Sequence, residues 1–292
     1  MSQALKAEVG YRRLAVQPLT GALGAEIRGV DLSKPLDDAT RQEIIGAFHE
    51  NLVIYFPEQK PLTPDQHLAF AAIFGPLMRI PHIFSVDGYP DLQIVRREAD
   101  EPGTYVVGEN WHTDSTFLER PPLCVVMRGV DIPEFGGDTF FANMYMGYEQ
   151  LSPKMKEVLG GLKAVHSATR IFGSAMTERQ KAKSVRVMDA AEGDREIVHP
   201  VIRTHPGTGR KLVWVNRVYV KCFEGMTEEE SRPLLEFLFN HCSRLEFSCR
   251  VRWRPNQVLV WDNRATWHKA IFDYPGKRRY LERVTIQGDR PV

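Results

Sequence analysis

The chain has 292 residues, of which 43% are hydrophobic and 26% charged, a composition that suits a globular protein with a sizeable core. Its formal net charge of +1, from 38 basic and 37 acidic residues, provides no overall positive field that would favour nucleic acid as a partner. No apolar run reaches 18 residues, and residues 1–15 lack an apolar signal-peptide core, so we expect no membrane partner. The four cysteines form no C-x-x-C pair, which predicts reduced thiols and a cytoplasmic location.

Residues 1–292 are predicted to form a single domain, because no Gly/Ser-rich or Pro-rich linker divides them. Residues 1–10 are predicted to be a loose tail. The part that follows is predicted to contain glycine-rich short strands over 16–30, a helix over 37–51, a buried strand over 52–56 and a helix over 63–74. The second helix has the clearest start, because Thr63, Pro64 and Gln66 form a capping box with proline in the first turn.

The later part of the chain adds further short strands and two helices. Residues 170–195 are polar and weakly periodic, and we interpret them as a lid, with a solvated loop as the alternative. A capping box at 227–230 predicts a helix, but Pro233 lies deep for that start, so the helix is expected to begin later or to bend. About ten short strands with helices near the ends indicate a mainly β sandwich or jelly roll.

One short stretch carries an imidazole and a carboxylate two residues apart. On a strand, His112 and Asp114 leave the same face and can reach one point. Two histidines and one carboxylate are the protein ligands of the facial triad that holds non-haem Fe(II) with open positions. The best candidate for the third ligand is His268. The alternative for His112 is an ordinary packed histidine.

Two arginines follow on the last predicted strand. Arg279 and Arg283 alternate with other residues and therefore share one face of the strand. Two guanidinium groups that point into one barrel repel each other unless anions lie between or beside them. Arginine is the residue best suited to hold a carboxylate with two parallel hydrogen bonds. The alternative for Arg283 is a surface salt bridge.

These motifs together resemble the TauD/TfdA family of Fe(II)- and 2-oxoglutarate-dependent dioxygenases. The matching pieces are residues 110–117, 136–139 and 261–268, the arginines at 279 and 283, and the opening Pro-Leu-Thr-Gly-x-Leu-Gly-Ala-Glu-Ile. They occur in the family's order over nearly the whole chain. The resemblance implies a double-stranded β-helix, or jelly roll, and an enzyme that uses Fe(II), 2-oxoglutarate and O2. We also expect a homo-oligomer.

The resemblance also implies a role for individual residues. It places iron on His112, Asp114 and His268, and the distal carboxylate of 2-oxoglutarate on Arg279 with help from the hydroxyl of Thr139. It gives Arg283 either to the acidic group of the substrate or to the near carboxylate of the cofactor. Thr139 has an alternative role, which is to complete the turn formed by residues 136–138.

The substrate is expected to be a small organic acid. Where taurine dioxygenases of the family carry a histidine and a tyrosine, this chain has Ile80 and Ile83, and an apolar wall cannot satisfy a small zwitterion. Ser115 is the third candidate for contact with the substrate. Residues 95–99, 166–169 and 249–253 resemble the (R)-phenoxypropionate branch of the family. An aryloxyalkanoate acid is therefore expected, with an alkyl sulfonate or sulfate ester as the alternative. A catalytically silent protein that binds metal or a small acid is the alternative of another class.

Overall fold

The computed structural model describes residues 10–81, 83–101, 108–171 and 190–292. Its helices are α1 (Asp38–Asn51), α2 (Pro64–Ala71), η1 (Ala72–Phe74), α3 (Met144–Glu149), α4 (Pro153–Gly160), α5 (Ala190–Gly193), α6 (Glu228–Cys242) and η3 (Leu245–Phe247). Its strands are β1 (Ala15–Pro18), β2 (Ala25–Arg28), β3 (Val53–Phe56), β4 (Ser85–Val86), β5 (Tyr89–Arg97), β6 (Cys124–Asp131), β7 (Thr139–Asn143), β8 (Lys163–Ser167), β9 (Glu196–Pro200), β10 (Ile202–Thr204), β11 (Lys211–Val213), β12 (Val220–Phe223), β13 (Ser248–Val251), β14 (Val258–Asp262), β15 (Thr266–Ala270) and β16 (Arg279–Thr285). None of the helices in these ranges has the length and apolar character needed to span a bilayer.

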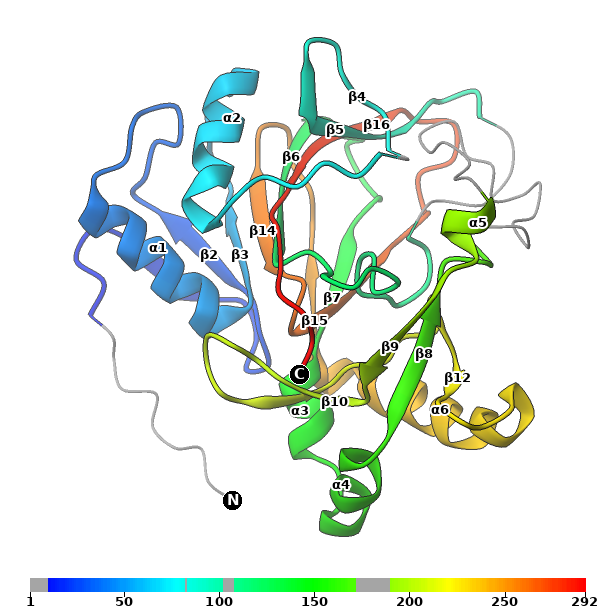
Figure 1. The fold of residues 1–292 in the computed structure, drawn as a ribbon. Coiled ribbons are helices and arrows are strands. Elements are labelled where there is room, and N and C mark those ends of the chain that lie inside the picture. The colour runs from blue at the N-terminus through cyan, green and yellow to red at the C-terminus, as the bar shows by residue number, and fades with distance from the viewer. Residues whose placement is uncertain (1–9, 82, 102–107, 172–189) are drawn as a thin grey trace.

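Two sheets form the body of the molecule. The large sheet has eight strands in the order β1-β2-β3-β14-β6-β16-β5-β4, and its pairs are antiparallel except for β2 with β3. The second sheet has the order β13-β7-β15. Two smaller sheets, β12-β8-β9 and β10-β11, lie beside α6 and α3 (Figure 1). This is the mainly β jelly roll with flanking helices that the sequence predicts.

Alternation along the strands gives the large sheet two different faces. On β14, Val258 and Val260 pack in one apolar cluster, and their neighbours Leu259 and Trp261 pack in another. The first cluster lies under α1 and α2, which cover the outer face of the sheet through residues such as Phe48 (Figure 1). Strand side chains alternate between faces with a period of two, so the outer face is closed by helices and the inner face is left for the second sheet.

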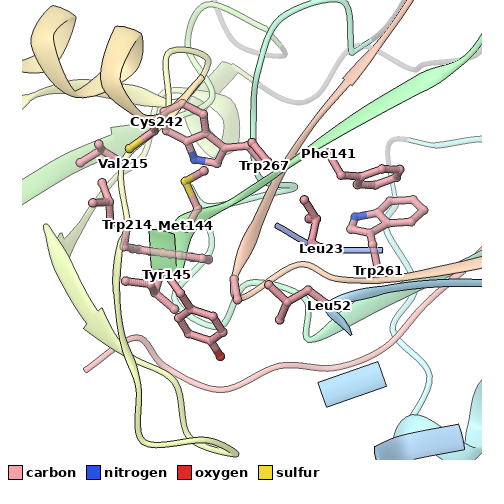
Figure 2. Packing of buried hydrophobic residues seen from close by; sticks show 14 of the residues in the cluster. Leu23, Leu52, Phe141, Met144, Tyr145, Trp214, Val215, Cys242, Trp261 and Trp267 are labelled. Carbon is pink, nitrogen blue, oxygen red and sulfur yellow. The ribbon is translucent and has the colours of Figure 1, made fainter. Parts of the chain in front are cut away.

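The inner cluster is the core between the two sheets. Phe141 of β7 and Trp261 of β14 come from different sheets, and their ring centroids lie 5.7 Å apart. Figure 2 shows these two rings together, with Trp267 of β15 and Trp214 in the same cluster. Burial of such large aromatic side chains contributes much of the free energy that holds two sheets together. The inner face is therefore a rigid surface against which functional groups can be positioned.

The helix boundaries follow the capping residues. Thr63 and Gln66 make both hydrogen bonds of the predicted capping box at α2. The helix α6 begins directly after its Thr227 cap, so the predicted later start is wrong, and the alternative, a bend at Pro233, stays a prediction. Its Pro233 is tolerated because the carbonyl that would lose a hydrogen bond belongs to exposed Glu229 in the first turn, where water can serve as the partner.

Two predicted segments lie mostly outside the described residues. They are the loose tail at 1–10 and the lid at 170–195, of which residues 10, 170–171 and 190–195 are described. At the start of the second segment, Arg170 pairs with Glu228 at the beginning of α6, with 2.8 Å between nitrogen and oxygen. The role of this segment as a lid stays a prediction.

Candidate active site

Three side chains from two distant segments meet on the inner side of the barrel. His112 pairs with His268 of β15 through two backbone hydrogen bonds, of 3.0 Å from the His112 N–H and 2.8 Å from the His268 N–H. This pairing holds the two imidazole rings with their centroids 4.1 Å apart. Asp114 follows two residues later, and one ligand atom from each of the three residues lies within 4.8 Å of the others.

The two histidines present nitrogen lone pairs to the same point. The Nδ1 of His112 is 2.7 Å from the carbonyl of Asn110, which makes Nδ1 the protonated nitrogen and leaves Nε2 free to bind a metal. The Nε2 atoms of His112 and His268 lie 3.5 and 3.7 Å from Oδ1 of Asp114. Burial holds the pKa of His268 well below its usual value, so this imidazole is neutral at pH 7.

Asp114 is held as an anion and in one orientation. Burial alone would raise the pKa of Asp114, but the Arg283 guanidinium holds it well below its usual value. The Nη2 of Arg283 donates to Oδ2 of Asp114 at 2.8 Å. Oδ2 is thereby occupied, and Oδ1 is the oxygen that faces the histidines.

The backbone of Asp114 is fixed by a single amide side chain. Asn263 accepts a hydrogen bond from the Asp114 N–H at 2.9 Å and donates to the Asp114 carbonyl at 3.1 Å. It also donates to the carbonyl of Pro122 at 3.1 Å. The buried Asn263 thus ties the segment that carries His112 and Asp114 to the turn that precedes β15.

That turn has its own buried support. Asp262 accepts two hydrogen bonds from the guanidinium of Arg264, at 2.9 and 2.7 Å, and one from His205 at 3.0 Å. Burial opposes ionisation of Asp262, but Arg264 and His205 hold its pKa below its usual value. The ligand His268 is therefore carried by a strand whose start is held by a satisfied ion pair.

The donor set fits Fe(II). Two imidazole nitrogens and one carboxylate oxygen lie within 4.8 Å of one another, and this set of three protein ligands leaves open coordination positions for a co-substrate and dioxygen. The partners of His112 and Asp114 supply the hydrogen bonds that orient metal ligands. When bound there, Fe(II) with 2-oxoglutarate supplies the activation of O2.

A pocket opens beside these ligands. It is lined by Val95, Gly108, His112, Asp114, Met127, Thr139, Phe141, Trp253, Trp261, His268, Ala270, Arg279 and Arg283. The structure thus brings together all six residues that the sequence predicts for the metal and the cofactor. Apolar walls from β5, β6, β7 and β14 surround the polar groups, as in most sites that bind small molecules.

Arg279 and Thr139 each have a hydrogen-bond donor to which a carboxylate could bind. In the described part of the chain Arg279 makes no ion pair within 4 Å, and its buried Nε has no hydrogen-bond partner. The Oγ1 of Thr139 accepts a hydrogen bond from Nε1 of Trp253 at 3.0 Å, so its own hydroxyl proton is free to be donated. Gly137 makes room for Arg279, because a Cβ at this residue would lie 2.9 Å from Cδ and Nε of the arginine.

Three of the four predicted substrate residues lie elsewhere, and the fourth, Arg283, lines the pocket. Ile80 and Ile83 are not among the described residues that line the pocket, and Ile80 is buried at 2% exposure. Ser115 is also buried and absent from the lining, with a left-handed backbone (φ 50°) directly after Asp114. His82, which lies between the two isoleucines, is outside the described residues. The contact of these three residues with a substrate stays a prediction.

Several polar partners of the site are missed by the sequence patterns. Trp253 orients Thr139, and Thr285 accepts from Nη2 of Arg283 at 3.2 Å. Gln93 lies across from Arg283 in the sheet register. The sequence offers one signal for these partners, which is the two-residue period of side chains along a strand. It places Thr285 on the same face as Arg283, and Gln93 on the same face as Val95.

Replacement of Asn263 tests how the metal ligands are held. Asn263→Ala removes both hydrogen bonds to the backbone of Asp114, and we expect Mn(II) to bind about 10–100-fold more weakly. Titration calorimetry without oxygen measures this. The matched control is Asn51→Ala, which removes another buried amide that bonds a backbone carbonyl, at the end of α1. Equal metal affinity in the two variants would contradict the role of Asn263.

Replacement of Arg279 tests the place of the cofactor. Arg279→Ala deprives a bound carboxylate of its buried partner, at about 2–5 kcal/mol, which raises the KM for 2-oxoglutarate by about 30-fold or more. Succinate formation over a range of 2-oxoglutarate concentrations measures the change. Arg278→Ala is the control, because this neighbour pairs with Glu98 and Asp131 on the surface. An unchanged KM in Arg279→Ala would show that the carboxylate binds elsewhere.

The sequence of this chain is similar to those of several known proteins. Residues 15–285 match the family described as "Taurine catabolism dioxygenase TauD, TfdA family". An alpha-ketoglutarate-dependent sulfate ester dioxygenase of Pseudomonas putida is 36% identical, over 96% of this chain and 91% of the relative. An alpha-ketoglutarate-dependent 2,4-dichlorophenoxyacetate dioxygenase of Cupriavidus pinatubonensis is 29% identical, over 96% of this chain and 99% of the relative.

A solved structure agrees with the sequence comparison. The crystal structure of a taurine dioxygenase from Burkholderia xenovorans is 35% identical and has a TM-score of 0.80, with 96% of this chain and 93% of that chain covered. The match extends over both sheets and over the segments that carry His112, Asp114 and His268. The chain therefore belongs to the TauD/TfdA family, and it is a non-haem dioxygenase that uses Fe(II), 2-oxoglutarate and O2.

Proposed function

We propose that the enzyme hydroxylates an acidic substrate at a carbon that bears an oxygen substituent, and that this substrate is an aryloxyalkanoate acid. The observation that carries the proposal is the position of Arg283. It lies beside the metal ligands with Nη2 on Asp114, and its buried Nε has no partner in the described part of the chain. A guanidinium with free N–H groups in an apolar pocket suits an organic anion.

The proposed reaction breaks an ether bond. Hydroxylation of the carbon next to the ether oxygen gives a hemiacetal or hemiketal. The carbon–oxygen bond then breaks, its electron pair leaves with the aryl oxygen, and the new hydroxyl becomes a carbonyl as it loses its proton. The products are a phenol and an oxo acid, formed together with succinate and CO2 from 2-oxoglutarate and O2.

The pocket walls support an apolar body for this acid. Val95, Met127 and Phe141 offer no hydrogen bonds from their side chains, and an unpaired polar group buried against them would cost about 1–3 kcal/mol. A small amino sulfonate has a charged amine at one end and is disfavoured by such walls. An aryl ring is favoured by them, as it buries apolar area. The resemblance of residues 95–99, 166–169 and 249–253 to the phenoxypropionate branch also supports this choice.

A sulfate ester is the second candidate, and the 36% identity to the Pseudomonas putida sulfate ester dioxygenase favours it. Such an ester also carries an anion and an oxygen-substituted carbon. Its hydroxylation at that carbon would release sulfate and an aldehyde by the same collapse. The two candidates therefore share their chemistry and differ in the group that leaves.

A substrate panel separates the candidates. The purified enzyme with Fe(II) and 2-oxoglutarate is offered both enantiomers of a phenoxypropionate, an alkyl sulfate, an alkyl sulfonate and taurine. We expect succinate and an equal amount of phenol from an aryloxy acid, measured by chromatography. Sulfate release from the alkyl sulfate alone would establish the second candidate. Succinate without any oxidised product from the panel would contradict both.

Replacement of Arg283 tests the anchor of the acid. Arg283→Leu removes the guanidinium, and we expect the KM for every oxidised acid to rise by about 30-fold or more at saturating metal. The KM for 2-oxoglutarate is measured in the same variant. A rise confined to 2-oxoglutarate would show that Arg283 serves the cofactor and not the substrate. Arg278→Leu is the control, because this arginine pairs with Glu98 on the surface.

A further inference from the structure

A chain of buried hydrogen bonds leads away from the metal carboxylate. Nη2 of Arg283 donates to Oδ2 of Asp114 at 2.8 Å and to Oγ1 of Thr285 at 3.2 Å. The hydroxyl of Thr285 donates to Oε1 of Gln93 at 3.3 Å. Nε2 of Gln93 donates to the carbonyl of Ile80 at 2.8 Å. Gln93 and Thr285 have no solvent exposure, and Arg283 and Ile80 are also buried.

The number of protons on each group fixes which atom donates and which accepts in this series of hydrogen bonds. The hydroxyl of Thr285 has one proton, which it gives to Gln93, so toward Arg283 it acts as an acceptor. Both protons of Nη2 are used, one by Asp114 and one by Thr285. The groups that remain for a ligand are Nε and Nη1. Asp114 and Thr285 therefore decide which N–H groups of the guanidinium remain free.

The sheet register brings these residues together. Arg283 of β16 and Gln93 of β5 are direct cross-strand partners, and Thr285 follows Arg283 on the same strand face. The segment before β4 is fastened to the same two strands. The N–H of Met78 donates to the carbonyl of Thr285 at 2.8 Å, and Gln93 holds the carbonyl of Ile80 two residues later.

We propose that Gln93 and Thr285 are positioning residues that join the 78–84 segment to Arg283, and thereby determine how the enzyme receives its acidic substrate. The function of Arg283 as a substrate anchor comes from the proposed function, on which this part rests. The hydrogen bonds from Arg283 to Asp114 and Thr285 do not depend on it. The 78–84 segment contains Ile80 and Ile83, whose contact with a substrate stays a prediction, and Gln93 fixes this segment at the carbonyl of Ile80.

Removal of Gln93 and removal of Thr285 from this series of hydrogen bonds have different effects on the site. Loss of the Gln93 amide leaves the buried carbonyl of Ile80 without its partner, which favours a shift of the segment toward water. Loss of the Thr285 hydroxyl frees one proton of Nη2 and lets the guanidinium rotate away from Asp114. The first change affects the substrate, and the second affects both the substrate and the metal carboxylate.

The experiment compares Gln93→Leu and Thr285→Val with their controls. Thr285→Ser keeps the hydroxyl and is the rescue variant. Gln59→Leu is the matched control for Gln93, because Gln59 also joins a loop through its amide, with Nε2 on the carbonyl of Val30 and Oε1 on the N–H of Leu32. Each variant is assayed for the KM for the oxidised acid, the KM for 2-oxoglutarate and the Kd for Mn(II).

We expect Gln93→Leu to raise the KM for the acid by about tenfold, with an unchanged KM for 2-oxoglutarate. Thr285→Val is expected to raise both the KM for the acid and the Kd for Mn(II), by about 3–10-fold, and Thr285→Ser to restore both. The double variant should be no worse for the acid than the more impaired of the two single variants, because the two residues act through one series of hydrogen bonds.

Two results would overturn the inference. One is a Gln93→Leu enzyme with the same KM for the acid as Gln59→Leu. The other is a Thr285→Val enzyme with the Mn(II) affinity of the unaltered protein. If the unaltered enzyme oxidises no acid in the panel, the proposed function fails, and the Mn(II) titration of Thr285→Val and Thr285→Ser decides the inference alone.

Discussion

The site depends on the pairing of two segments that lie more than 150 residues apart in the chain. The backbone bonds between His112 and His268, of 3.0 and 2.8 Å, extend the β13-β7-β15 sheet by one residue and bring the two imidazoles together. Asn263 adds a second connection to Asp114. Neither segment could hold a metal by itself, because each supplies at most two ligands. The free energy of folding is thus used to bring the ligands together before any metal binds.

The strands β6 and β14 contribute to both the core and the pocket, because their side chains alternate between the two faces of the large sheet. Met127 and Trp261 belong to the inner apolar cluster and also line the pocket, while Val126 and Val260 lie in the outer cluster under the helices. Dense packing on the outer face leaves the strands little freedom to shift. The packing of the large sheet therefore fixes the pocket walls, whereas the metal ligands lie on β15 and on the 112–114 segment that pairs with it.

The sequence permits prediction of the pocket groups that we assign to iron and 2-oxoglutarate. Arg279 and Arg283 share one face of β16, as the period of two predicts. His112 and Asp114 also converge, but the predicted strand is wrong for them, because His112 makes only an isolated β-bridge and Asp114 lies in a turn. The partners of these groups could not be predicted, because they depend on register. That Gln93 lies opposite Arg283, or that Trp253 reaches Thr139, follows from strand pairing across more than 100 residues. For α6, local rules predicted the Thr227 cap but gave Pro233 too much weight, because the carbonyl that loses its partner belongs to Glu229 in an exposed first turn.

Arg279 and Arg283 differ in whether the protein supplies a counter-ion for the guanidinium. Arg283 has an anion within the protein, because Asp114 accepts its hydrogen bond at 2.8 Å. Arg279 is also buried, yet in the described residues it has no ion pair, and burial lowers its pKa from the usual value. A buried cation without a counter-ion is costly, and an external carboxylate removes that cost. Arg279 is thus the arginine of the pocket that no group in the described ranges neutralises, and the free energy of this unpaired charge favours a dicarboxylate that can reach both Arg279 and the metal. The unpaired charge supports the proposed assignment of 2-oxoglutarate to Arg279 independently of sequence resemblance.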